Sequence, residues 1–336
     1  MVGVAYHAGI LRALDLVGGL RPDDADLIVG TSAGSVVGAY LRSGFSTEDL
    51  WQLAMGTHDR LQALSGPEVQ PFVTNELRRL ATRSPVNLAR LGVGSAAVLA
   101  MSLLRRRLNV PDRLLDVFPA GLFSMEEARR RFVRDLPDDW PHRPLSICAT
   151  DVRTGERVVM GHPDGTSVRL TDAIMASCAI PGVFPPVRLG GQLLVDGGVV
   201  SSTNLDVATA AGCTFIVAVA PMAFDPTVES PVTRLIRRSP GRAVAREGEE
   251  AVRAGVETLL IRPTAAQLAE QGPNLMRAAG LDAVARIAYD MTAPILEGGL
   301  AADLLANAGA ASGPRDRVEV RARPLDGPAA VSLTSS

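Results

Sequence analysis

The sequence predicts an α/β protein with a mostly parallel sheet, and three observations carry this prediction. The chain has 336 residues, of which 47% are hydrophobic, so it can bury a large core. Patterns typical of helices and strands alternate along much of its length, and such alternation favours a parallel sheet. Near the N-terminus, the apolar run "DLIV" (26–29) leads into "GTSAGS", and helical spacing follows over 36–41.

The first half of the chain is predicted to be mostly helical around one strand. Residues 1–14 have the apolar spacing of a helix, and 26–41 are predicted to form a strand, a tight turn and a helix. The arginine-rich stretch 46–141 is predicted to be a helical insertion. Two capping boxes are expected to start new helices there, one at Ser46 with Asp49 and one at Ser124 with Glu127.

From residue 144 the periodicity changes to that of strands and short helices. The strands "LSICAT" and "RVVMG" are expected to join at "RTGE", and Thr171 is expected to be the N-cap of the helix "LTDAIMAS". A hairpin is expected to turn at Gly190-Gly191. A helix at "DVATAAG" and strands at "TFIVAVA" and "VETLLIRP" follow, and we expect a mobile tail over 311–336.

The composition excludes several classes of function. A net charge of -2 and only 4% aromatic residues do not suit a nucleic-acid partner. The three cysteines lie far apart without a CxxC spacing, and the histidines lack metal-ligand spacing. We therefore expect no metal site and no disulfide framework, and a reducing cytoplasm fits best.

The most apolar stretch, "LGVGSAAVLAMSLL" (91–104), precedes three arginines at 105–107. It is shorter than the roughly 20 residues that span a bilayer. Two interpretations stay open: a buried helix with a basic end, or a surface helix that makes a peripheral contact with anionic lipid.

The pentapeptide "GTSAG" fits the G-x-S-x-G pattern of a serine nucleophile. Ser32 is predicted to lie at a sharp strand-to-helix turn, where Gly30 and Gly34 let the backbone bend and substrate approach. The amide of Ala33 can then face a developing oxyanion. An ordinary glycine-lined turn is the alternative.

A serine nucleophile needs a base, and histidine cannot take the place it has in α/β-hydrolases. The last of the four histidines is His162, so the second half of the chain has none. Asp196 is the best candidate, because it ends the apolar run "LLV" and precedes Gly197 and Gly198. Taken alone, Asp-Gly-Gly is also a common turn.

With these motifs in order, the chain resembles the bacterial patatin-like phospholipases. That family pairs a serine in G-x-S-x-G with an aspartate in D-G-[GA] and works without histidine; the matching residues here are Ser32 and Asp196. "YHAGILRAL" (6–14) resembles the family's first helix, and "ASCAIPGVFPPV" (176–187) resembles the segment before its aspartate. The resemblance extends over about residues 2–300.

The resemblance implies a three-layer α/β/α sandwich within a domain of residues 1–310, including the helical insertion at about 46–141. It also implies hydrolysis of carboxylic esters in lipids through an acyl-enzyme. Ser32 would be the nucleophile, Asp196 the proton acceptor, and the amides of Gly3 and Ala33 the oxyanion donors. No metal or cofactor is needed.

The resemblance also implies a strand and a glycine-rich oxyanion loop just before the first helix, of which only Gly3 is present here. We expect the reading frame to continue upstream; a naturally shortened protein is the alternative. Because of the missing loop, a catalytically weak lipid-binding homologue stays open as an alternative function. An acyltransferase using the same dyad also stays open, because the sequence does not distinguish acyl transfer to another acceptor from hydrolysis.

Four other polar residues receive structural interpretations. His7 is expected to pack in the first helix, and Cys178 to be a small buried residue. Asp151 is expected to be a turn residue, and Asp206 to cap the helix of "DVATAAG".

Overall fold

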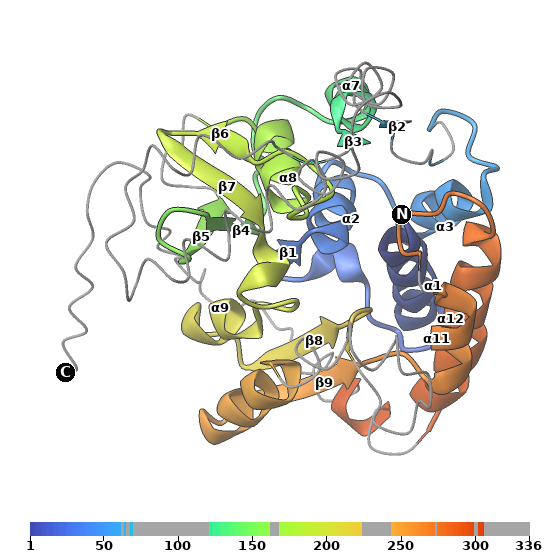
Figure 1. The fold of residues 1–336 in the computed structure, drawn as a ribbon. Coiled ribbons are helices and arrows are strands. Elements are labelled where there is room, and N and C mark those ends of the chain that lie inside the picture. The colour runs from blue at the N-terminus through green and yellow to red at the C-terminus, as the bar shows by residue number, and fades with distance from the viewer. Residues whose placement is uncertain are drawn as a thin grey trace.

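The computed structural model has the alternating helices and strands of an α/β protein (Figure 1). It describes residues 1–61, 64, 68–69, 121, 123–161, 168–223, 243–272, 274–298 and 302–305. The expected lipid-contact segment 91–107 and the tail 311–336 lie outside these residues, as does most of the expected insertion. Inside the insertion, α3 (Thr47–Met55) and α7 (Glu126–Asp135) are helical, and β2 (Glu68–Val69) pairs with β3 (Phe123–Ser124).

Among the described residues, the largest sheet has five strands: β1 (Ile28–Thr31), β4 (Leu145–Asp151), β5 (Arg157–Gly161), β6 (Val187–Leu189) and β7 (Gln192–Asp196). β1 is parallel to β4, whereas β5 and β7 are antiparallel to β4, and β6 is antiparallel to β7. A second sheet pairs β8 (Phe215–Val219) in parallel with β9 (Glu257–Ile261). Two of the described strand pairs, β1–β4 and β8–β9, are parallel, and they lie in different sheets. The predicted hairpin joins β6 to β7 at Gly190-Gly191, as expected.

The pairing register brings the ends of β1 and β7 together. Because β5 already pairs along one edge of β4, β1 and β7 share the other edge. Thr31, the last residue of β1, pairs with Cys148, and Asp196, the last residue of β7, pairs with Ala149. The two strands run in opposite directions, so their carboxyl ends meet head to head.

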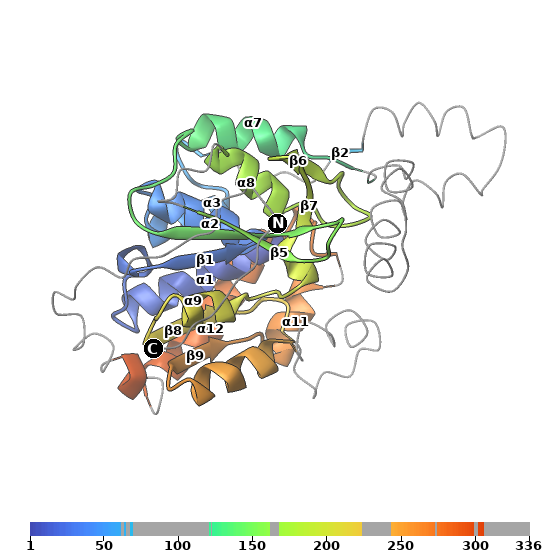
Figure 2. The ribbon, with the colours of Figure 1, turned by 90° about the vertical axis from the view of Figure 1, so that its left-hand side faces the viewer.

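The N-terminal helix α1 (Val2–Leu16) is buried among other helices. It packs against α2 (Ala33–Arg42), α3 and α12 (Leu281–Leu296) (Figures 1 and 2). A Cβ on Gly9 would lie 2.2 Å from the backbone oxygen of Ala285, so α1 and α12 cross too closely for any other residue there. This close packing explains why position 9 of α1 is a glycine.

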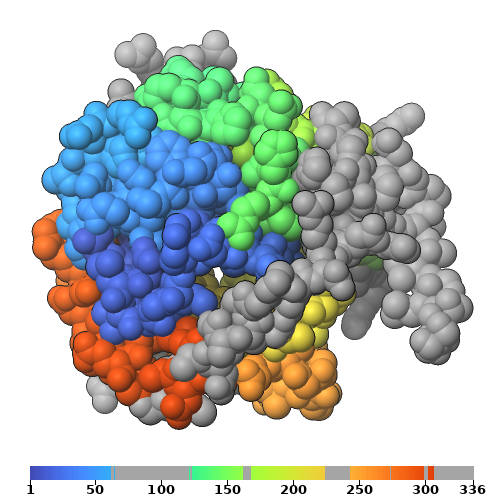
Figure 3. All heavy atoms as spheres, turned by 180° about the vertical axis from the view of Figure 1, so that it is seen from behind, coloured from blue at the N-terminus to red at the C-terminus, as the bar shows by residue number. Residues whose placement is uncertain are grey.

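The two parallel strand pairs remain separate in the described part of the chain. β1 is the last strand of its sheet and β8 belongs to the other sheet, while α9 (Leu205–Ala210) contacts both strands. Seen from behind, the surface is hollowed between the blue N-terminal residues and the yellow residues (Figure 3). Within the described residues, no helix has the length and apolar character needed to cross a membrane.

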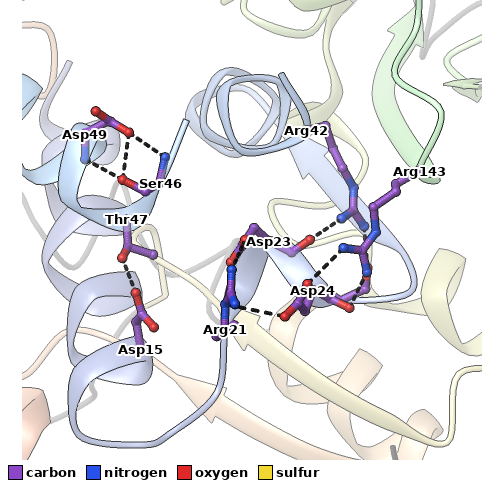
Figure 4. Close-up of polar contacts among 10 residues, drawn as sticks. Asp15, Arg21, Asp23, Asp24, Arg42, Ser46, Thr47, Asp49 and Arg143 are labelled. Atoms are coloured by element: carbon purple, nitrogen blue, oxygen red, sulfur yellow. Dashed lines mark hydrogen bonds and ion pairs between the residues drawn. The ribbon is translucent and has the colours of Figure 1, made fainter. Parts of the chain in front are cut away.

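Two arginines fix the ends of β1 and β4 that lie away from the turn at Ser32 (Figure 4). Arg42, the last residue of α2, donates to the backbone oxygens of Asp23 at 2.7 Å and Pro144 at 3.2 Å. Arg143 pairs with the carboxylate of Asp24 at 3.0 Å. Arg42 thus anchors α2 to the loops before β1 and β4, and Arg143 joins these two loops to each other.

One of the two predicted capping boxes is present. The Ser46 hydroxyl accepts from the amide of Asp49, and the Asp49 carboxylate accepts from the amide of Ser46 (Figure 4). The box predicted at Ser124 is wrong, because α7 begins after Met125 and Ser124 instead accepts from the amide of Glu126.

The predicted N-cap at Thr171 is also wrong. The helix α8 (Leu170–Ser177) begins two residues earlier than this cap predicts, with Arg169 as its N-cap. Leu170 is fully buried in the core, and this burial draws it into the first turn of the helix. Thr171 is therefore a helix residue, and the gain from burying an apolar side chain outweighs the local preference of threonine for a cap.

Candidate active site

Ser32 lies at the sharp turn between β1 and α2 that the pattern predicted. Its backbone has φ 52° and ψ −118°. Among the described non-glycine residues, only Ser32 and Asn204 have a positive φ. Such a conformation costs on the order of 1–3 kcal/mol and persists only where surrounding contacts enforce it.

The glycines around Ser32 have different roles. A Cβ on Gly30 would lie 2.6 Å from the Cα of Ser35 and 2.7 Å from the backbone oxygen of Gly34, so the first turn of α2 packs directly on Gly30. A Cβ on Gly34 would meet nothing closer than the Nε2 of His7, at 3.8 Å. Gly30 is thus required by the backbone, whereas the space beside Gly34 is open.

The backbone of Ser32 is held by Ser177, the last residue of α8. The amide of Ser32 donates to the hydroxyl of Ser177 at 2.9 Å, and that hydroxyl donates to the backbone oxygen of Cys148 at 2.7 Å. Two residues after Ser177, the backbone oxygen of Ala179 accepts from the amide of Asp196 at 3.0 Å. The segment 177–179 therefore holds both Ser32 and Asp196.

Asp196 ends β7 in a turn that only glycine allows. A Cβ on Gly197 would lie 2.4 Å from the backbone oxygen of Cys148, so the turn presses directly on β4. The amide of Gly198 donates to Oδ1 of Asp196 at 2.7 Å. These contacts leave the Asp196 side chain 6% exposed and fixed at the end of β1.

The ends of β1 and β7 bring the turn at Ser32 next to Asp196. The Ser32 hydroxyl lies near enough to the Asp196 carboxylate to act on its pKa. Burial raises the pKa of Asp196 to about 6, against the lowering effects of the hydrogen bonds from Ser32 and from the amide of Gly198. A carboxylate with such a pKa is ionised at neutral pH and basic enough to accept a proton.

Gly3 and Ala33 also lie side by side. A Cβ on Gly3 would be 2.8 Å from the Cβ of Ala33. Gly3 belongs to the first turn of α1 and Ala33 to the first turn of α2. First-turn amides have no partner within their own helix and attract negative charge, so two such helix ends meet beside Ser32.

Two other titratable side chains, those of His7 and Cys178, lie near the turn at Ser32. His7 is buried in α1, its Nδ1 lies 2.7 Å from the backbone oxygen of Gly3, and burial lowers its pKa. Burial raises the pKa of Cys178 to about 12, which keeps its thiol protonated. In the described part of the chain, no group of three or more His, Cys, Asp or Glu side chains could hold a metal ion.

Two further interpretations can be compared with the structure. Asp151 ends β4 and accepts from the amide of Arg153 at 2.8 Å, as expected of a turn residue. The expected cap at Asp206 is wrong, because Asn204 is the N-cap of α9. Asp206 lies in the first turn instead, where Arg157 pairs with it at 2.7 Å.

Comparison with known proteins decides the family. Residues 2–209 match the patatin-like phospholipase family, a span that includes both Ser32 and Asp196. The chain belongs to the patatin-like phospholipase family. It is 37% identical over 76 residues to uncharacterized NTE family proteins of Mycobacterium tuberculosis (Rv2565, strain H37Rv) and Mycobacterium bovis (Mb2594).

These matches cover 23% of this patatin-like chain and 12% of the length of each mycobacterial relative. The chain is also similar to VipD from Legionella pneumophila, at 15% identity and a TM-score of 0.37, over 88% of this chain and 65% of VipD's.

The sequence patterns missed Ser177 as a site residue of this patatin-like protein. Ser177 and Ser32 are 145 positions apart, and no local spacing links them. The only sequence signal was the resemblance of "ASCAIPG" to a segment of the family, which does not say what the serine touches.

Proposed function

We propose that this protein hydrolyses carboxylic ester bonds in lipids with a Ser32-Asp196 dyad. The observation that carries the proposal is the head-to-head meeting of β1 and β7, which brings the turn at Ser32 next to the buried carboxylate of Asp196. Membership in the patatin-like phospholipase family supports a lipid as the substrate. We place this chemistry on a three-layer α/β/α sandwich, the arrangement that the resemblance implies.

The reaction proceeds in two steps. Ser32 Oγ attacks the acyl carbonyl while Asp196 accepts the hydroxyl proton, and the alcohol of the lipid leaves with that proton. Water then attacks the acyl-enzyme and passes a proton to Asp196. Asp196 returns this proton to Ser32 Oγ as the bond to the acyl group breaks and the fatty acid leaves. No metal ion takes part in this scheme.

The amides of Gly3 and Ala33 are the proposed oxyanion donors. Their helix ends adjoin Ser32, and each lost donor of this kind typically lowers a rate by about 10²–10³-fold. The proposal therefore assigns to α1 a role in catalysis as well as in packing.

The rate of hydrolysis should depend on one ionisation near pH 6. Catalysis needs the ionised form of Asp196, and burial raises its pKa to about 6. kcat/KM for a short-chain nitrophenyl ester should be level above about pH 7 and fall about tenfold for each pH unit below 6. A profile that stays level down to pH 4 would contradict the role of this buried carboxylate.

Replacing His7 with asparagine should preserve hydrolysis. The asparagine amide can keep the bond to the backbone oxygen of Gly3, and His7 is not the base in the proposal. Loss of a general base costs about 10²–10⁴-fold, so His7→Asn should stay within about tenfold of the wild type. Steady-state kinetics and a melting curve test this together. A folded variant as inactive as Ser32→Ala would make His7 the base.

A further inference from the structure

Thr31, the residue before Ser32, is enclosed by the loop that follows Asp196. The side-chain amide of Asn204 donates to the hydroxyl oxygen of Thr31 at 2.7 Å, across 173 positions of sequence. On the other side, a Cβ on Gly197 would lie 3.1 Å from the methyl carbon of Thr31. The loop 196–204 therefore contacts the end of β1 at two places.

Asn204 is fixed in an unusual conformation to make this contact. It is fully buried, and its φ of 48° is left-handed, a region that suits glycine better than asparagine. Its amide also donates to the backbone oxygen of Ser201 at 2.7 Å, and its backbone N–H donates to the Ser201 hydroxyl at 2.9 Å. The side chain is thus held rigidly while it reaches Thr31.

A buried carboxylate supports the same loop from outside. Glu247, which is 3% exposed, accepts from the hydroxyl of Thr203 at 2.7 Å and from the amide of Leu205 at 3.1 Å. These bonds hold the residues on either side of Asn204. They do not touch β1, so they provide a comparison for the bond to Thr31.

We infer that Asn204 is a positioning residue for the dyad. Its bond to Thr31 ties the loop that begins at Asp196 to the strand that ends at Ser32, so both groups keep one relative placement. This inference rests on the proposed function. It assigns a role to the second of the two described non-glycine residues with a positive φ, the first being Ser32 itself. Small misplacements of reacting groups cost up to about 10²-fold in rate.

The test compares Asn204→Gly, Thr31→Val and the double variant. Glycine accepts the left-handed backbone and removes only the side chain, and valine keeps the shape of threonine without its hydroxyl. Asn204→Gly should lower kcat for a nitrophenyl ester about tenfold or more, with KM within about twofold. Labelling of Ser32 by an alkyl fluorophosphonate should slow by the same factor. The double variant should be no slower than the slower single variant, because both remove the same bond.

Thr203→Val is the matched control. It removes a hydrogen bond of the same loop to Glu247 and leaves the bond to Thr31, so it should leave kcat and the labelling rate unchanged. Equal labelling rates in Asn204→Gly and the wild type, or fully multiplicative effects in the double variant, would overturn the positioning role. A wild type that is labelled at Ser32 but hydrolyses no ester overturns the proposed function instead, and the labelling rates then decide the role of Asn204.

Discussion

Ser32→Ala should lower ester hydrolysis by about 10⁴-fold or more, and Asp196→Asn by about 10²–10⁴-fold. The first change removes the attacking oxygen, and the second removes the proton acceptor while keeping the shape of the side chain. Initial rates on a nitrophenyl ester and on a phospholipid, measured with matched protein concentrations, check both.

Asp151→Asn is the matched control for Asp196→Asn. Asp151 is also a buried aspartate at the end of a strand of the same sheet, but its carboxylate accepts from the amide of Arg153 and from the side chain of Gln192, away from the turn at Ser32. It should keep wild-type turnover. An Asp196→Asn variant as active as this control would remove Asp196 from the mechanism.

Asp196→Asn should also be more stable than the wild type at alkaline pH. Burial raises the pKa of Asp196 in the folded chain to about 6, above its value in the unfolded chain, so keeping the group ionised costs folding free energy above pH 6. That cost is on the order of 3 kcal/mol at pH 8. Asp196→Asn should thus melt higher at pH 8, and the difference should shrink as the pH falls toward 4.

Gly30→Ala should abolish activity by breaking the turn, while Gly34→Ala should leave the fold intact. The methyl group at position 30 would meet backbone atoms of Gly34 and Ser35 that cannot move without unwinding α2. Such overpacking should cost about 3 kcal/mol of stability. At position 34 the space is open, and alanine is favoured in a helix by up to about 1 kcal/mol over glycine.

Melting curves of the two alanine variants distinguish these expectations. Gly30→Ala should melt several degrees lower than the wild type, and Gly34→Ala at or above it. Equal melting of both variants would mean that α2 does not pack on Gly30 as the structure shows.

The sequence predicted those parts of the site that depend on neighbouring residues. The turn at Ser32, the hairpin before Asp196 and the capping box at Ser46 each follow from residue types within a few positions. The failed caps at Ser124 and Thr171 were also local predictions. The cap at Thr171 failed because burial of the adjacent Leu170 in the core decided where the helix begins.

The contacts between distant segments could not be predicted in this way. The meeting of Ser32 with Asp196 depends on the registers of β1 and β7 on β4, which no local pattern determines. The same holds for Ser177 and Asn204, whose hydrogen bonds to the turn join segments far apart in the chain. Residues of this kind appear only when the sheet is assembled.

The most direct test of the dyad is to follow inactivation by an alkyl fluorophosphonate while locating the label by mass spectrometry. In this reaction Ser32 Oγ bonds to phosphorus, fluoride leaves, and Asp196 takes the proton. Our account predicts one label per chain, on Ser32, with ester hydrolysis lost in proportion to labelling and no label on Ser32→Ala. Full hydrolysis by completely labelled protein, or inactivation through a label on another residue such as Cys178, would contradict it.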